Sequence, residues 1–244
     1  MRKRSRHVGR FARATTVTIV VVGVVALALA ASAASLGGIS VGSIFMQSTD
    51  VHIDLPDTPT PIVSTDFSGC SNLIDGWIDE SGAIWASHSG NWQCLGSGVV
   101  RAQQRTPLAN LSVEIAQSSG IRISADISDI SHQNDRSGAG ISLLGDGSGE
   151  FFYVIYERDV EQLTIGVAGE APFAVVTAVG DVAAATMSIE IVGNEMFVEF
   201  GSVAIGPFDL TAEAPQLVGN TWFGLVADND NQSRFDNFTI ELLP

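Results

Sequence analysis

Strict alternation of apolar and polar residues is the feature that most restricts the fold of this chain. Between residues 121 and 130 the apolar positions recur at every second residue. Side chains point to opposite faces at successive positions of a β-strand, so this pattern predicts a strand with one buried face. The apolar positions are Ile121, Ile123, Ala125 and Ile127, followed by Ile130, and the polar ones are Arg122, Ser124, Asp126 and Ser128.

Similar short runs recur along the chain and are separated by turn-forming segments such as Asp146-Gly147-Ser148-Gly149 and Gly193-Asn194. Many short strands with such breaks predict an all-β sandwich. The expected strands are Gly98–Gln103, Ser112–Ala116, Arg122–Ile130, Gly138–Leu144, Phe151–Glu157, Gln162–Val167, Phe173–Val179, Thr186–Val192, Met196–Phe200, Val203–Ile205, Thr221–Ala227 and Phe235–Leu242.

The N-terminus carries a membrane-targeting signal. Six of the twelve Lys and Arg residues lie in residues 1–13, which the positive-inside rule places in the cytoplasm. Residues 14–49 contain no charged residue, and the 20-residue apolar stretch Val17–Leu36 is long enough to span a bilayer. We therefore expect one N-terminal membrane helix or signal peptide within residues 14–46.

Two interpretations of this segment remain open. Ala31-Ser32-Ala33 has the small-x-small form of a signal-peptidase site, with processing near Ala33 or Ala34. The length of the uncharged stretch instead favours an uncleaved signal-anchor. The first interpretation gives a secreted protein, and the second a single-pass cell-membrane protein with an extracytoplasmic C-terminal domain.

A proline-rich linker is expected at residues 47–64, because Pro56, Pro59 and Pro61 fix the backbone and remove hydrogen-bond donors. The folded domain is then expected at residues 65–244. Within it Cys70 and Cys94 are the only cysteines of the chain. An exported chain meets an oxidising compartment, so we expect these two to form a disulfide.

The charge of the exported part restricts its partners. Residues 14–244 contain 6 Arg, no Lys and 27 Asp and Glu residues, a formal charge of −21. Nucleic acid is therefore not expected as a partner, since binding a phosphate backbone requires clustered basic residues.

The order of the domain's motifs resembles the concanavalin A-like lectin/glucanase superfamily, in particular its laminin-G-like and 3-keto-disaccharide-hydrolase-type jelly rolls, over residues 65–244. This resemblance implies a two-sheet antiparallel jelly-roll sandwich with adjacent N- and C-terminal strands. The motifs that carry it are Asp66-Phe67-Ser68, the region Trp85–Trp92 leading into Gly98-Val99-Val100, Gly138-Ala139-Gly140-Ile141, Phe152-Tyr153-Val154, Thr221-Trp222-Phe223-Gly224 and the closing Phe235-Asp236-Asn237-Phe238.

Catalytic motifs are missing from the sequence. Glucanases of the superfamily carry Glu-x-Asp-x-x-Glu on one strand, and this chain has no such motif. The nearest equivalent in this chain is the group Glu190, Glu195 and Glu199. These residues lie on both sides of a turn and are expected to face solvent. We therefore favour a protein that is not an enzyme, and we expect His52, His88 and His132 to be ordinary surface residues.

Aromatic residues provide the candidates for glycan binding, because sugar faces stack on rings. Three tryptophans fall in one loop-rich stretch, where they either fill the core or offer an exposed ring. Two tyrosines lie on one strand and point to opposite faces, so that one of them faces a sheet surface. The candidates are Trp77, Trp85, Trp92, Tyr153 and Tyr156.

Oxygen-rich loops provide a candidate metal site. Asp228-Asn229-Asp230-Asn231 offers hard oxygen ligands of the kind that Ca²⁺ prefers. The expected ligands are Asp228, Asp230 and Asn231, with Asp146 joining them if the loops converge. A polar turn of this composition also forms without any metal.

Three functions follow from these observations. The favoured one is an exported, membrane-anchored, non-catalytic β-sandwich that binds glycan or another extracellular polymer. The alternatives are a glycoside hydrolase-like enzyme of the same fold and a purely structural envelope or adhesion module.

Overall fold

The computed structural model describes residues 59–130 and 137–244, all within one compact unit. The basic segment, the expected membrane segment, most of the linker and His132 lie outside the described residues. Among those described, no helix has the length and apolar character needed to cross a membrane.

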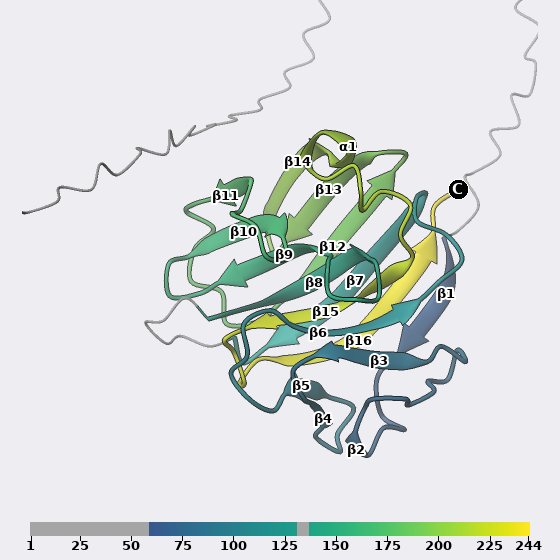
Figure 1. The fold of residues 1–244 in the computed structure, drawn as a ribbon. Coiled ribbons are helices and arrows are strands. Elements are labelled where there is room, and N and C mark those ends of the chain that lie inside the picture. Colours follow the sequence, from purple (N-terminus) through teal and green to yellow (C-terminus); the bar gives the residue numbers. More distant parts are fainter. Residues whose placement is uncertain (1–58, 131–136) are drawn as a thin grey trace, which may run out of the picture. The chain divides into compact units, whose positions relative to one another are not determined.

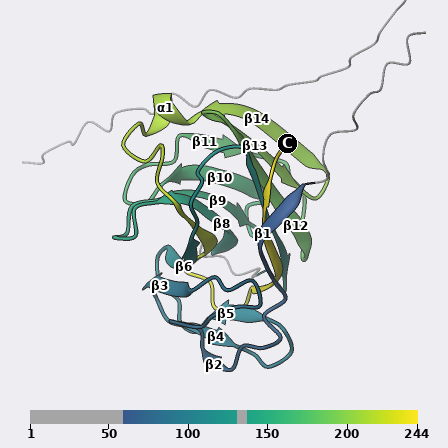
Figure 2. The ribbon, with the colours of Figure 1, turned by 90° about the vertical axis from the view of Figure 1, so that its right-hand side faces the viewer.

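Two antiparallel sheets make up the fold, and Figure 2 shows them as two layers seen from the side. The seven-stranded sheet lies toward the viewer in Figure 1. Its order is β11 (Ala174–Val176), β10 (Gln162–Val167), β9 (Phe152–Glu157), β8 (Gly138–Gly145), β15 (Trp222–Asp228), β6 (Ala109–Glu114) and β3 (Trp85–Ser89).

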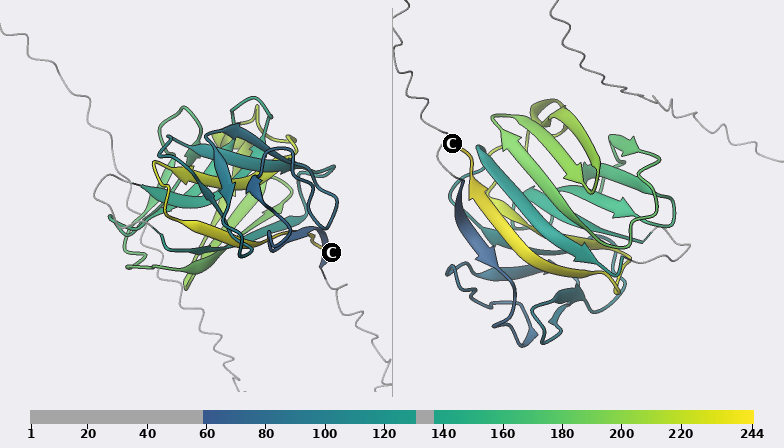
Figure 3. Two further views of the ribbon diagram at one scale, coloured as in Figure 1. Left: turned by 90° about the horizontal axis from the view of Figure 1, so that it is seen from below. Right: turned by 180° about the vertical axis from the view of Figure 1, so that it is seen from behind.

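The nine-stranded sheet forms the other layer and faces the viewer in the right-hand view of Figure 3. A single helical turn, α1 (Leu210–Glu213), follows its edge strand and is capped by Asp209. The order is β14 (Val203–Asp209), β13 (Glu195–Phe200), β12 (Ala185–Val192), β7 (Ile121–Ser128), β16 (Arg234–Leu242), β5 (Val100–Ala102), β4 (Trp92–Cys94) and β2 (Asn72–Leu73), with β1 (Thr60–Thr65) paired to β16.

The predicted period of two is confirmed in β7. Its odd-numbered side chains are buried in the core between the sheets, whereas the even-numbered ones are partly exposed on the outside. On that outer side Arg122 forms ion pairs with Glu190 of β12 and Glu241 of β16. The all-β class and the two antiparallel sheets predicted from the sequence are thus confirmed.

The folded part begins earlier than expected. β1 pairs with β16 from Thr60↔Leu242 to Thr65↔Phe238, so residues 60–64 belong to a sheet and not to the linker. The sequence did not predict this strand because Pro61 is typical of a linker and uncommon inside a strand. Proline is tolerated here because the pairing register shifts between Pro61 and Val63, where a ladder hydrogen bond is not required. The first and last strands are adjacent, as the resemblance implied.

The boundaries of several other strands also differ from expectation. β6 begins at Ala109, directly after Leu108 with a φ of 47°, and β14 continues to Asp209 through Pro207. β11 is reduced to three residues. The short strands β2, β3 and β4 were not expected, because strands of two to five residues are too short to display a period.

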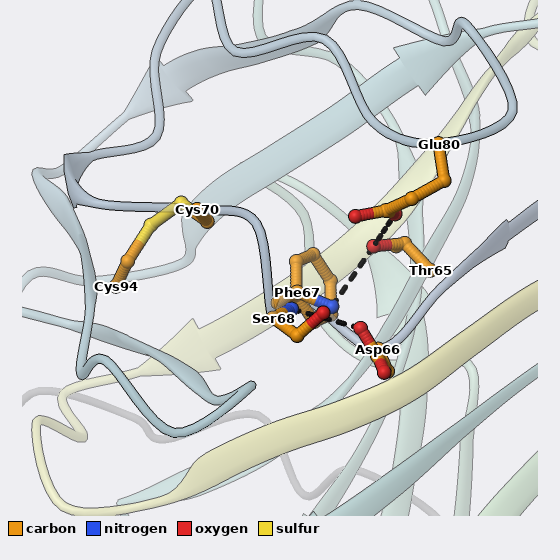
Figure 4. Close-up of a disulfide and its surroundings, with 7 residues drawn as sticks. All are labelled: Thr65, Asp66, Phe67, Ser68, Cys70, Glu80 and Cys94. Carbon is orange, nitrogen blue, oxygen red and sulfur yellow. Dashed lines mark hydrogen bonds between the residues drawn. A yellow bond between two sulfur atoms is a disulfide. The ribbon is translucent and has the colours of Figure 1, made fainter.

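The expected disulfide between Cys70 and Cys94 is present, with Cα atoms 5.8 Å apart. Figure 4 shows it beside a turn in which Thr65 Oγ1 accepts a hydrogen bond from the Phe67 backbone N–H at 2.9 Å and donates to Glu80 at 3.1 Å. The Asp66 carboxylate accepts from the Ser68 backbone N–H at 2.8 Å. The disulfide thereby ties the segment that follows β1 to β4.

Candidate functional site

Two of the three candidate tryptophans are core residues. Trp85 and Trp92 are 0% and 1% exposed. Trp85 packs edge-on against Phe238, with ring centroids 5.0 Å apart, and Trp92 packs against Phe235 at 5.6 Å. Neither ring has a face open to a ligand, so of the two interpretations that the sequence left open, core filling is correct for both and the glycan platform is not. Trp77 is partly buried and packs against Phe67.

The two candidate tyrosines point to opposite faces of β9, as predicted. Tyr156 is fully buried in the core, where its hydroxyl donates to the Gly180 carbonyl at 2.5 Å and accepts from the Val182 N–H at 3.0 Å. Its ring therefore cannot contact a ligand. Tyr153 lies on the outer face of the seven-stranded sheet, the face turned away from the core, but it is only 6% exposed.

Large side chains of the seven-stranded sheet and its flanking residues cover much of the outer face of this sheet. Tyr153 belongs to a small second apolar cluster, on the opposite side of the sheet from the main core. Burial raises the pKa of the Tyr153 hydroxyl, and the charges of Asp228 and Glu157 raise it further. The centre of the face is therefore not an open groove. The cluster consists of Phe151, Tyr153, Ile155 and Val226, with Leu108 and Ala168 packed against it.

Beside this cluster lies a small hollow around Trp222, which we call the Trp222 hollow. Its volume of about 10 Å³ is room for roughly a single water, so a larger ligand has to lie across it. Trp222 is partly exposed and meets His88 edge-on, with ring centroids 4.6 Å apart and planes at 88°. The hollow is lined by His88, Asn110, Ser112, Ser142, Gly145, Gly147, Gly149, Glu150, Phe151 and Trp222.

The hollow has a polar floor made by β6 and β8. Asn110 Nδ2 donates to Ser142 Oγ at 2.6 Å, and Ser112 Oγ donates to Asn110 Oδ1 at 3.3 Å. The hydroxyl proton of Ser142 and the Nε2 atom of His88 have no hydrogen-bond partner within the described part of the chain. Unused hydrogen-bonding capacity beside an aromatic ring suits a hydroxylated ligand.

The loop of residues 145–150 closes one side of the hollow and leaves the Trp222 side chain partly exposed. Asp146 accepts hydrogen bonds from the backbone N–H groups of Ser148, Gly149 and Glu150, at 2.7, 3.0 and 3.1 Å. The Ser148 hydroxyl also bonds to Asp146, and this bond is the main reason why the pKa of the carboxylate is lowered. A Cβ at Gly147 would lie 2.9 Å from Trp222 Nε1, so only glycine fits there without displacing the ring.

The structure does not bring Asp146 to the segment that contains Asp228, Asp230 and Asn231. Asp228 pairs with Gly138 at the first residue of β8, whereas Asp146 follows the last residue of that strand. Asp230 is 1% exposed, and its oxygens accept from the Gln232 and Ser233 backbone N–H groups and from the Ser233 hydroxyl. Across residues 59–130 and 137–244, no group of three or more His, Cys, Asp or Glu side chains is arranged to hold a metal ion.

Two carboxylates lie at the other end of the outer face. Glu157 and Asp228 both pair with Gly138, from opposite sides, which places their Cα atoms about 10 Å apart from the strand spacing. Glu157 accepts from Gln162 at 2.7 Å and Thr164 at 3.1 Å, and Asp228 accepts from the Leu108 N–H at 3.1 Å. Burial raises the pKa of Asp228. Both groups hold neighbouring strands and loops together.

Sequence reasoning missed Trp222, the fourth tryptophan of the chain. A usable signal was present: Phe223 and Leu225 alternate with Trp222 and Gly224, so the tryptophan lies on the outer face of β15. Gly145 of β8 is paired with Trp222, and Ser112 of β6 and Ser142 of β8 are both paired with Gly224, so these neighbours of the ring are small.

Comparisons with known proteins support the fold alone. No family model matches this chain, and no curated protein matches its sequence. Among solved structures, the carbohydrate binding module CBM66 from Bacillus subtilis is similar with a TM-score of 0.51 at 13% identity, covering 70% of this chain and 98% of that one. A structure from work on endo-acting O-glycanases expressed by prominent members of the human gut microbiota gives a TM-score of 0.52 at 10% identity, covering 76% and 100%.

A mutant of the GH43 protein BlXynB from Bacillus licheniformis has a TM-score of 0.51 at 11% identity, covering 65% of this chain. This chain spans only 36% of that protein's length. These structures show the fold alone: the chain has a jelly-roll sandwich fold that it shares with them.

Proposed function

We propose that this chain is an exported, membrane-anchored, non-catalytic β-sandwich that binds a glycan at the Trp222 hollow. The observation that carries the proposal is a partly exposed tryptophan beside a floor of Asn and Ser groups, which matches the two needs of sugar binding, a ring face and fixed polar groups. The similarity to a carbohydrate binding module supports it at the level of the fold. Export and anchoring are supported by the basic segment and apolar run in residues 1–46.

A hydrolase-like enzyme is the second candidate, because Glu157 and Asp228 flank Gly138 on the same face. A pair of carboxylates on one face of a sheet is what glycosidases use. Their oxygens, however, already accept hydrogen bonds from Gln162, Thr164 and the Leu108 N–H. This engagement favours a structural role and therefore a binding protein.

A glycan array probed with the whole chain, in a detergent without sugar head groups, tests the proposal. We expect binding to at least one glycan class, and we expect Trp222→Ala to reduce it at least tenfold. Trp77→Ala is the matched control, because Trp77 is also a partly buried tryptophan but lies outside the hollow. Absence of binding to every sugar on the array would favour the structural module, and release of reducing ends would favour the enzyme.

Anchoring is tested separately. We expect the chain to remain in the membrane fraction after a carbonate wash and to be accessible to protease from outside the cell. Recovery of the shortened chain in the medium would instead indicate cleavage near Ala33.

A further inference from the structure

We propose that the glycan carries free, unacetylated amino groups, and that one such ammonium binds between the Trp222 ring and the Glu150 carboxylate. This inference rests on the proposed function and specifies the class of sugar. Its starting point is the charge of the hollow: Glu150 lines it, and none of its lining residues is Lys or Arg.

The Glu150 carboxylate is available to a ligand. It is exposed at the end of the loop, and its side chain makes no hydrogen bond or ion pair with any residue in the described ranges. By contrast, Asp146 in the same loop is used to hold the turn. Glu150 is thus a free negative charge next to an accessible aromatic ring.

An organic cation fits this pair of groups better than other ligands. The face of an indole ring attracts ammonium ions, with the strongest such attraction among aromatic side chains, and a carboxylate beside it adds to that attraction. A metal ion would need several oxygen ligands, preferably carboxylates, and Glu150 is the only carboxylate among the residues that line the hollow. A uronic acid or sulfated sugar would bring its negative charge against Glu150, and no Lys or Arg lines the hollow to bind it.

The net negative charge of the domain also favours a cationic ligand. The described residues contain 5 Arg, no Lys and 23 Asp and Glu. Three of these arginines are paired with acidic residues elsewhere: Arg122 with Glu190, Arg158 with Asp181 and Arg234 with Asp129. A domain of this charge attracts polycations and repels polyanions at a distance.

Calorimetry on the whole chain in a zwitterionic detergent can separate the classes of sugar. The probes are three β-1,4-linked hexamers of glucosamine, N-acetylglucosamine and glucose, measured at pH 6. We expect the glucosamine hexamer to bind at least five times more tightly than the other two, and to lose this preference at high ionic strength.

Glu150→Gln removes the charge and keeps the shape of the side chain. We expect it to weaken glucosamine binding about two- to fivefold, the range of an exposed ion pair, and to leave binding of the glucose hexamer unchanged. Glu195→Gln makes the same change of charge at an exposed position of the other sheet and should have no effect.

Each outcome is decisive. Equal or tighter binding of the acetylated or neutral hexamer, or an unchanged preference in Glu150→Gln, overturns the amino-sugar inference and leaves glycan binding standing. Silence of all three hexamers, together with silence of the glycan array, overturns both.

Discussion

The indole N–H of Trp85 donates a 3.0 Å hydrogen bond to Oδ2 of Asp79, a carboxylate that is only 6% exposed. The other oxygen, Oδ1, accepts from the backbone N–H groups of Ser81 and Ala83, both at 2.9 Å. One acidic side chain thus fixes both a tight turn and one of the two fully buried tryptophan rings of the core. This bond explains why Trp85 is a structural residue and not a sugar platform.

We expect Asp79→Ala to lower the free energy of unfolding by about 2–4 kcal/mol, because it removes several buried hydrogen bonds and leaves the Trp85 N–H without an acceptor. Urea denaturation measures this change. Asp75→Ala is the control: Asp75 is exposed and accepts one bond, from the Ser87 N–H at 3.0 Å, so its loss should cost less than about 1 kcal/mol. Equal losses in the two variants would contradict the assignment.

Replacing both cysteines by serine should lower the free energy of unfolding by about 3 kcal/mol, because the Cys70–Cys94 bridge restricts the unfolded chain over a separation of 24 residues. A reducing agent should lower the melting temperature of the unmodified chain and leave that of the double variant unchanged. If the reducing agent has no effect on the unmodified chain, the bridge does not contribute to stability.

Gly140→Ala should be among the most damaging small substitutions, with a loss of about 3 kcal/mol. A Cβ at this position would lie 1.8 Å from the carbonyl oxygen of Val154 on β9, so the two strands would have to separate. Gly82→Ala is a useful comparison, since it has open space around it but a φ of +88°, and should cost only about 1 kcal/mol. Thermal unfolding of the two variants tests the difference.

Asp228→Asn should stabilise the domain at neutral pH and lose that advantage in acid. Burial raises the pKa of Asp228 above its ordinary value of 3.8. Ionisation of Asp228 therefore lowers the stability of the folded state. This loss of stability appears as the pH rises from 3.8 to the raised pKa of the folded state, and it persists at higher pH. The amide carries no charge, so it avoids this loss.

Asp146→Asn should show the opposite dependence. The pKa of Asp146 is lowered, chiefly by the Ser148 hydroxyl. The ionised Asp146 side chain therefore stabilises the fold at pH values above its ordinary pKa of 3.8. This stabilisation disappears as the pH falls through the lowered pKa of the folded state. Urea midpoints measured between pH 3 and 8 check both variants, and a parallel pH dependence in the two would contradict both predictions.

Most of the fold could be predicted from sequence, because burial of alternate side chains imposes the period that β7 and β12 display. β1 could not, since Pro61 resembles a linker residue and its partner strand lies some 180 residues away. Local pattern contains no information on such distant pairing.

The binding site was harder to predict than the fold. Trp85 and Trp92 look like sugar platforms in sequence because they lie in a loop-rich, disulfide-linked stretch, yet a carboxylate and a phenylalanine hold them in the core. Trp222 lies in a strand, where the sequence pattern alone does not distinguish an exposed ring from a packed one. Its exposure depends on small residues of two neighbouring strands, such as Ser112 and Ser142, that only the sheet register brings beside it.

The pairing of β1 with β16 also sets how the domain responds to force. Any load carried by the chain before Thr60 reaches the sheet at the rung Thr60↔Leu242. A load that pulls β1 away from β16, across the rungs, strains them one after another, starting at this end. For a domain tethered through this end and pulled in that direction, we expect β1 to detach first, while the sheet that carries Trp222 is still intact.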